Sequence, residues 1–398
     1  MIPEIRTWFN SNFTEDKYRN LVQYLEDWYD TPISFRIAES PFFIPAVLKE
    51  RLLDACHEIS SFIIDPDFKE LTKEALLNAE IVVPDEDEHT LFLQMDFAVC
   101  LDKNGDPYPQ LIEIQGFPSV YFFQWMIGQA FKKVYEIPEY LTSYFKDIST
   151  EQYRELLRDI IVGEEDPRHV VLLEIEPEKQ TTYIDMLSTS RELNIACICV
   201  TQVLKSGNKL YYIDHTGNQT EIRRIYNRVI FDELQSRKDL KLNFNFSDQL
   251  DVEWIGHPNW FYRISKYCLP LLKSRYVPDT FYLKDLSDWP EDLEKYVLKP
   301  LYSFAGSGVL IDLKTQDLDA IVDPENYILQ KKVEYAPVIK SPDDFVKCEI
   351  RMLMLWPKGA EKQEIVNNLV RMSKGKMVGV KYNKDKTWVG GSVGFFEK

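Results

Sequence analysis

Two short apolar runs near residue 100, LFLQMDFAVCL and PQLIEIQ, carry polar side chains at alternate positions. The Asn104-Gly105 pair between them predicts a hairpin with a two-residue turn. That turn places Asp96 opposite Glu113 and Gln94 opposite Gln115, all on one face. Facing carboxylates repel, and a hard cation such as Mg²⁺ between them would relieve the repulsion. The alternative is an ordinary hairpin with a polar, solvent-facing side.

A second group of residues could hold phosphate. The segment YVLKPLYSFAGSGVLIDL predicts a strand ending near Lys299, then a loop of small residues, then another strand. Small residues let backbone N–H groups approach phosphate oxygens, and a lysine adds a point charge. No Lys-Ser/Thr pair follows the glycines, so the loop is not a Walker A motif, and no helix follows, as a dinucleotide fingerprint would need. The alternative is a glycine-rich hairpin turn. The small residues of the loop are Ser303, Ala305, Gly306, Ser307 and Gly308.

Composition bounds the class of protein. The chain has 398 residues, enough for two or three domains of roughly 100–200 residues each. Its net charge of −17 argues against a nucleic-acid partner. The six cysteines form no CxxC pair and no zinc spacing, which is typical of reduced thiols in a cytosolic protein. Neither a signal peptide nor an apolar run of the roughly 18–20 residues needed for a membrane span occurs. We therefore expect a cytoplasmic protein without a membrane partner.

The order of apolar patterns predicts an α/β fold in three parts. Residues 1–165 read as a helical region that contains the carboxylate hairpin at 90–116. Residues 166–253 begin with HVVLLEIEP, TTYIDMLSTSRELN and IACICVTQVL, a strand–helix–strand unit typical of a doubly wound layer. Residues 254–398 begin with a predicted helix and continue as strands and hairpins.

Several of these segments together resemble the ATP-grasp superfamily. The matching pieces are Lys299-Pro300, the loop from Ser303 to Val309, the strand Tyr327 to Val333, and two later strands that carry Arg351 and Arg371. In the usual family order, strands with the metal-binding residues come after these pieces. Here Asp96 and Glu113-x-Gln115 precede them instead. This permuted order resembles glutathionylspermidine synthetase and eukaryotic-type glutathione synthetase.

The resemblance implies an ADP-forming carboxylate–amine ligase that acts through an acylphosphate, with ATP and Mg²⁺ as cofactors. It implies that Asp96 and Glu113 hold Mg²⁺, with Gln115 as a third ligand. The segment WIGHPNWFYRISKYCLPLLK resembles the helix that carries the first ATP lysine, which would be Lys266; Lys299 would be the second. The two lysines would bind the α- and β-phosphates, and the small-residue loop would close over them.

The same resemblance implies roles for residues further along the chain. Gln330, Lys331 and Val333 would line the adenine pocket. Arg351 and Arg371 would face the γ-phosphate or the acylphosphate. Arg228, in IYNRVIFDEL, would hold the acid substrate, or would be a surface arginine of a strand. Amino acids, peptides and polyamines are all compatible substrates, and the oligomeric state stays open.

Three positions depart from the family pattern. Gln94 stands where those synthetases have an arginine, and Gln115 replaces a metal-binding asparagine. Ala305 stands where a loop glutamate contributes to metal binding. These departures leave a second hypothesis open, an ATP-binding protein without ligase activity.

Overall fold

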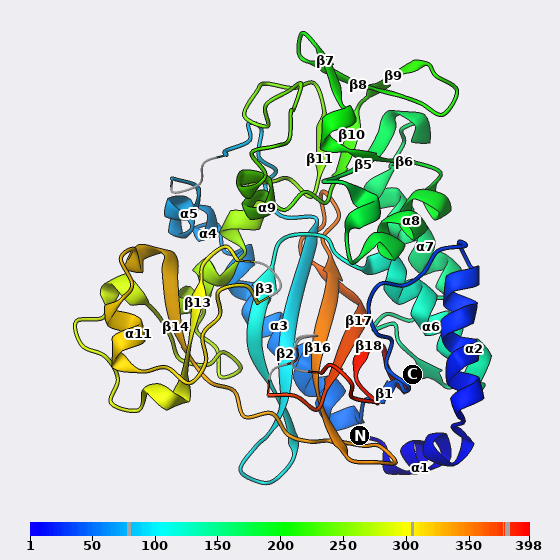
Figure 1. Cartoon of the computed structure of the whole chain (residues 1–398), viewed down its shortest axis with the longest axis vertical. Helices are drawn as coiled ribbons and strands as arrows, with labels where there is room; N and C mark the ends of the chain where they lie inside the picture. The colour runs from blue at the N-terminus through cyan, green and yellow to red at the C-terminus, as the bar shows by residue number, and fades with distance from the viewer. Residues whose placement is uncertain (78–80, 304–305, 377, 379–382) are drawn as a thin grey trace.

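The computed structural model describes residues 1–77, 81–303, 306–376, 378 and 383–398, which form a mixed α/β fold with several sheets (Figure 1). In the described part of the chain no helix is long and apolar enough to span a membrane. The helices are α1 (Pro3–Asn12), α2 (Glu15–Asp27), α3 (Ala46–Ile64), α4 (Phe68–Leu71), α5 (Lys73–Leu77), α6 (Tyr121–Tyr135), α7 (Thr150–Ile161), α8 (Tyr183–Leu193), α9 (Phe231–Ser236), α10 (Trp260–Arg263) and α11 (Thr315–Asp319).

A six-stranded sheet lies at the centre of the molecule (Figure 1). Its main path runs β18–β17–β16–β2–β3, and β15 pairs with β16 at one end. Because β2 pairs antiparallel with β16, the sheet joins strands from the first and the last of the three regions predicted from the sequence. Its strands are β2 (Phe92–Leu101), β3 (Pro107–Gln115), β15 (Ile339–Lys340), β16 (Phe345–Leu355), β17 (Glu364–Ser373) and β18 (Gly390–Ser392).

The β2–β3 hairpin has the predicted side-chain pairs but not the predicted turn. Leu101 pairs with Pro107, and the backbone N–H of Asp102 donates to the carbonyl of Asp106, so the loop is longer than two residues. The register then shifts next to Asp96, where Ile112 is the extra residue on β3. This β-bulge offsets the longer loop. Asp96 therefore lies opposite Glu113, and Gln94 opposite Gln115, as the sequence predicts.

A four-stranded parallel sheet, in the order β11–β10–β5–β6, covers one end of the central sheet (Figure 1). It contains the predicted strand–helix–strand unit as β5, α8 and β6. The strand predicted from residue 195 to 204 is interrupted after Cys199 by a 3₁₀ turn. Strand order reverses between β5 and β10, and the crevice at such a reversal is the usual ligand site of an open parallel sheet. The strands are β5 (Val170–Glu174), β6 (Ala196–Cys199), β10 (Arg224–Asn227) and β11 (Glu253–Ile255), followed outward by the antiparallel β7 (Leu204–Ser206), β8 (Lys209–Ile213) and β9 (Gln219–Ile222).

A small lobe beside β3 carries a three-stranded antiparallel sheet, β12–β14–β13 (Figure 1). The strands are β12 (Thr280–Tyr282), β13 (Tyr296–Pro300) and β14 (Tyr327–Lys331). This lobe has a hydrophobic core of its own, separate from the main core. The core is made of Leu283, Leu293, Leu298, Leu313, Leu318 and Leu329.

The ends of the chain meet in a third small sheet, where β19 (Gly394–Glu397) lies between β1 (Phe42–Phe43) and β4 (Leu141–Thr142). Helix α3 packs against β3, and α2 packs against α6 on the other side of the molecule (Figure 1). The helix predicted at the start of the last region is shorter than expected. It forms α10 and then a 3₁₀ helix, Lys266–Leu271, which contains Pro270. A proline removes a backbone donor and disfavours a continuous α-helix.

Candidate functional site

Charged side chains gather on one face of the central sheet. Asp96 on β2 lies directly opposite Arg351 on β16, and Glu349 on β16 lies opposite Arg371 on β17. Arg351 binds Asp96 in a bidentate manner, with Nε–Oδ1 at 2.6 Å and Nη2–Oδ2 at 2.7 Å. Arg371 Nη2 reaches the same carboxylate at 2.5 Å and Glu349 at 3.0 Å. The two predicted phosphate-facing arginines are thus brought together with a predicted metal ligand.

Lys266 lies at the start of the 3₁₀ helix and reaches the same face. Its Nζ lies 3.0 Å from Glu113 Oε1 and 2.6 Å from the carbonyl oxygen of Ser303. Burial opposes ionisation of Glu113, but the positive charges of Lys266 and Arg351 outweigh it and lower the pKa of this carboxyl to about 2. Glu113 is therefore a carboxylate at neutral pH, already paired with a cation of the chain.

Lys299, at the end of β13, extends from the small lobe to the bulge in β3. Its Nζ donates to the carbonyl oxygen of Ile112 at 2.9 Å and to Gln330 Oε1 at 2.6 Å. Gln330 is itself fixed by a hydrogen bond to Thr280. Burial lowers the pKa of Lys299 to about 8, against the opposing effect of Glu113. The structure therefore places Gln330 as a partner of Lys299, which the sequence did not predict.

A cavity of about 30 Å³ lies between Lys266 and the small lobe, and it has room for roughly one or two waters. Glu113, Gln115 and Ser303 also line it. Gln115 Oε1 and Ser303 Oγ are buried without a hydrogen-bond partner, although polar groups in such positions are normally paired. The nucleotide that the resemblance implies is larger than this space.

The predicted magnesium ligands fit a cation unequally. Glu113 and Gln115 share the cavity, and the unpartnered amide oxygen of Gln115 is a suitable donor for a hard cation. Asp96 differs, because guanidinium groups occupy both of its oxygens. Within the described residues no three His, Cys, Asp or Glu side chains cluster as metal ligands would.

The remaining predicted nucleotide contacts lie at the edge of the small lobe. Gly306, Ser307 and Gly308 are exposed in a turn, and Ala305 lies outside the described residues. Gly308 has φ +70°, and a side chain there would clash with Pro300, so glycine suits this position. Lys331 ends β14 in an exposed position, and Val333 follows half-buried beyond the strand.

Arg228 lies just after β10, at the carboxyl edge of the parallel sheet, and is not a surface residue. Its Nη1 lies 2.5 Å from Asp185 Oδ2, and both side chains are almost fully buried. Its Nε, like Asn227 Nδ2 next to it, is buried without a partner. Two buried donors therefore lie next to each other at this edge, an arrangement compatible with the predicted role in holding an acid.

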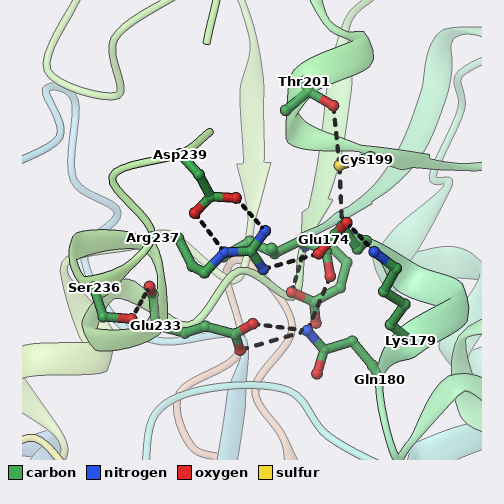
Figure 2. Close-up of polar contacts among 11 residues, drawn as sticks. Glu174, Lys179, Gln180, Cys199, Thr201, Glu233, Ser236, Arg237 and Asp239 are labelled. Atoms are coloured by element: carbon green, nitrogen blue, oxygen red, sulfur yellow. Dashed lines mark hydrogen bonds and ion pairs between the residues drawn. The ribbon is translucent and has the colours of Figure 1, made fainter. Parts of the chain in front are cut away.

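Other polar residues at this edge were not predicted from the sequence (Figure 2). Glu174, at the end of β5, is buried, and its burial raises the pKa of the carboxyl to about 8 against the opposing charge of Arg228. Figure 2 shows Gln180 donating to Glu233 and Arg237 paired with Asp239. Arg237 also pairs with Glu176. One signal was available: Glu174 is the first charged residue in the apolar run HVVLLEIEP.

Of the comparisons with known proteins, the one with solved structures finds a similar fold. No protein-family model matches the chain, and a search of curated protein sequences finds no match. Among solved structures, the chain is similar to a glutathione synthetase-like effector from Globodera pallida in its apo form. The TM-score is 0.57 at 12% sequence identity, and the match covers 91% of this chain and 96% of the other. At this identity the likeness concerns the fold alone.

Proposed function

We propose that the protein is an ATP-dependent carboxylate–amine ligase of the ATP-grasp type, with the permuted order of glutathionylspermidine synthetase-like enzymes. One observation supports this above the others: four cationic side chains from distant parts of the sequence meet at the strand pair that carries the facing carboxylates Asp96 and Glu113. They are Lys266, Lys299, Arg351 and Arg371. Three of them pair with these carboxylates, and the fourth, Lys299, donates to the carbonyl of Ile112 beside Glu113. Lysine and arginine side chains that gather on one face are the groups that bind a polyphosphate ligand.

In the proposed reaction the terminal phosphoryl group of ATP passes to the carboxylate of the acid substrate, which gives an acylphosphate and ADP. The amine then attacks the acyl carbon and releases phosphate. Lys266 and Lys299 hold the phosphates of ATP, while Arg351 and Arg371 neutralise the group in transfer. Glu113 and Gln115 would hold Mg²⁺, which supplies further neutralisation of phosphate charge when it is bound. Side chains here position and stabilise charge and form no covalent bond.

The substrates would bind between the cavity and the carboxyl edge of the parallel sheet. Arg228 and Asn227 offer unpartnered donors for the carboxylate of the acid. We expect a small acid or peptide and an amine as substrates, in the cytoplasm. Residues 166–253 would then act as the substrate layer and residues 254–398 as the nucleotide-binding half.

A second candidate is an ATP-binding protein that has lost ligation. Gln94 and Gln115 depart from the family pattern, and Asp96 is bound to two arginines instead of facing an open metal position. This candidate predicts nucleotide binding without turnover.

The test is thermal unfolding with and without Mg·ATP. A ligand at about 100 times its dissociation constant adds about 2.7 kcal/mol, which raises the midpoint by a few degrees in a chain of this size. We expect the shift in wild type and in Lys295→Ala, an exposed lysine of the same lobe, and its loss in Lys299→Ala. No shift in wild type at saturating ATP would refute both candidates.

Turnover separates the two candidates. ADP release would be followed with an acid alone and with the same acid plus an amine, over a panel of amino acids, peptides and polyamines. Release that requires both substrates supports the ligase. ATP binding without release on any pair supports the second candidate.

A further inference from the structure

We propose that Asp96 is an internal occupant of an anion site formed by Arg351 and Arg371, and that a phosphoryl group of the ligand displaces it. Asp96 would then compete with the ligand and would not be a metal ligand. The inference builds on the proposed function, because a phosphate ester is the anion assigned to this face. It gives Asp96, which the resemblance assigns as a magnesium ligand, a different role.

The first support is that both oxygens of Asp96 are paired with Arg351 and Arg371. Asp96 is 2% exposed, and its two oxygens accept three hydrogen bonds of 2.7 Å or less from guanidinium groups. A bidentate guanidinium–carboxylate pair has the geometry with which arginine also binds phosphate. To coordinate a cation, Asp96 would have to leave both arginines or bring the cation against two positive charges.

The second support is a donor that Asp96 does not use. Arg371 Nε is buried and has no partner, although Nη2 of the same side chain binds both Asp96 and Glu349. Asp96 presents two oxygens to the arginines: Oδ1 accepts one bond from Arg351, and Oδ2 accepts one from each arginine. A phosphoryl group has three, so it could replace both oxygens of Asp96 and also reach this Nε. The chemical class of the ligand is therefore a tetrahedral oxyanion.

The third support is that solvent, and therefore an anion, can reach Arg371. The side chain of Arg371 is 36% exposed, whereas those of Arg351 and Asp96 are 8% and 2% exposed. An anion can thus approach from the Arg371 side and displace Asp96 from there. With Asp96 and Glu349 in place, the two arginines are neutralised one for one. Loss of the Asp96 charge leaves one net positive charge facing the ligand.

The two roles of Asp96 predict opposite results for Asp96→Asn. The probe is pyrophosphate, titrated by calorimetry in the presence of EDTA, so that no divalent cation contributes. As a competitor, Asp96 weakens binding in wild type, and Asp96→Asn should bind pyrophosphate about tenfold more tightly or better, since close buried charge pairs are worth at least that much. Equal or weaker binding by the folded variant overturns the proposal.

Mn²⁺ titration without nucleotide supplies a second readout. Asp96→Asn should leave Mn²⁺ affinity at the wild-type value, whereas the matched carboxylate variant Glu113→Gln should lower it. A loss in Asp96→Asn as large as that in Glu113→Gln would make Asp96 a metal ligand and overturn the proposal.

If Asp96→Asn does not fold, an experiment on the wild-type protein tests whether an anion displaces Asp96 from the arginines. Crystals grown with pyrophosphate and EDTA should show the anion on Arg371 and Asp96 released from that side chain. Pyrophosphate bound elsewhere, no pyrophosphate at all, or an unchanged Asp96 pair overturns the proposal. A positive result in protein that fails to bind ATP would keep the anion site and refute the proposed function separately.

Discussion

At the scale of single residues, Glu174 is a buried carboxyl that forms no ion pair among the described residues. Its Oε1 accepts the backbone N–H of Ile175, and burial raises its pKa from 4.5 to about 8. Between these two pH values the unfolded chain ionises Glu174 while the folded protein keeps the proton. The folded state therefore binds more protons there, and the free energy of unfolding falls as pH rises from 4.5 to 8.

Glu174→Gln, which replaces the carboxyl by a neutral group of the same shape, should remove this dependence of the free energy of unfolding on pH. At pH 8 the variant should be more stable than wild type by roughly 2–4 kcal/mol, since each pKa unit corresponds to about 1.4 kcal/mol. At pH 5 the difference should be small. Urea unfolding at both pH values measures it, with the exposed Glu178→Gln as the unchanged control. A difference that does not depend on pH would mean that Glu174 is ionised in the folded protein.

At the scale of elements, Asp185 on α8 holds together three parts of the fold. It pairs with Arg228 after β10, and it accepts the backbone N–H groups of Val120 and Phe123 at the start of α6, each at 3.0 Å. Val120 has φ +60°, an unfavourable conformation for a β-branched residue, so the carboxylate fixes a strained entry into the helix.

Asp185→Asn should therefore lower the free energy of unfolding by about 3–5 kcal/mol, because it leaves the Arg228 charge buried and unpaired. Adding Arg228→Gln should recover part of the loss, since the buried charge is then gone. Asp159→Asn, at an exposed position on α7, should change stability by less than about 0.5 kcal/mol. Chemical denaturation of the four proteins tests this. A double variant no more stable than Asp185→Asn would show that the helix contacts, and not the ion pair, carry the effect.

The elements also show where sequence reasoning reached its limit. The alternation on β2 and β3 was enough to pair Asp96 with Glu113, although the predicted turn was wrong, because the bulge at Ile112 restored the register. The pairs of Asp96 with Arg351 and of Lys266 with Glu113 could not be predicted, since they join residues far apart in sequence. Local periodicity carries no information on which strands become neighbours across such distances. The contact of Lys299 with Ile112 could not be predicted either, because its acceptor is a backbone carbonyl, which every residue carries.

At the scale of the whole molecule, the small lobe of β12–β14 contains a second hydrophobic core beside the main one. It has its own leucine core, but Leu301 and Ile328 of the lobe are buried in the main core. Polar contacts of Lys299 with Ile112 and of Lys266 with Ser303 also join the lobe to the rest of the molecule. Lys266 and Lys299 lie on the two sides of this junction, so a nucleotide held by both would add contacts between the lobe and the central sheet.

Hydrogen exchange provides the corresponding prediction. A nucleotide between Lys266 and Lys299 adds contacts that link the lobe to the central sheet, so amides of β13 and β14 should exchange about tenfold more slowly with ATP, as expected for roughly 1.4 kcal/mol of added local stability. Amides of β5, in the core of the parallel sheet, should not change and serve as the internal control. In Lys299→Ala the protection by ATP should disappear. Protection that appears in β5 and not in β13 or β14 would place the nucleotide outside the lobe and exclude the arrangement in which Lys266 and Lys299 share it.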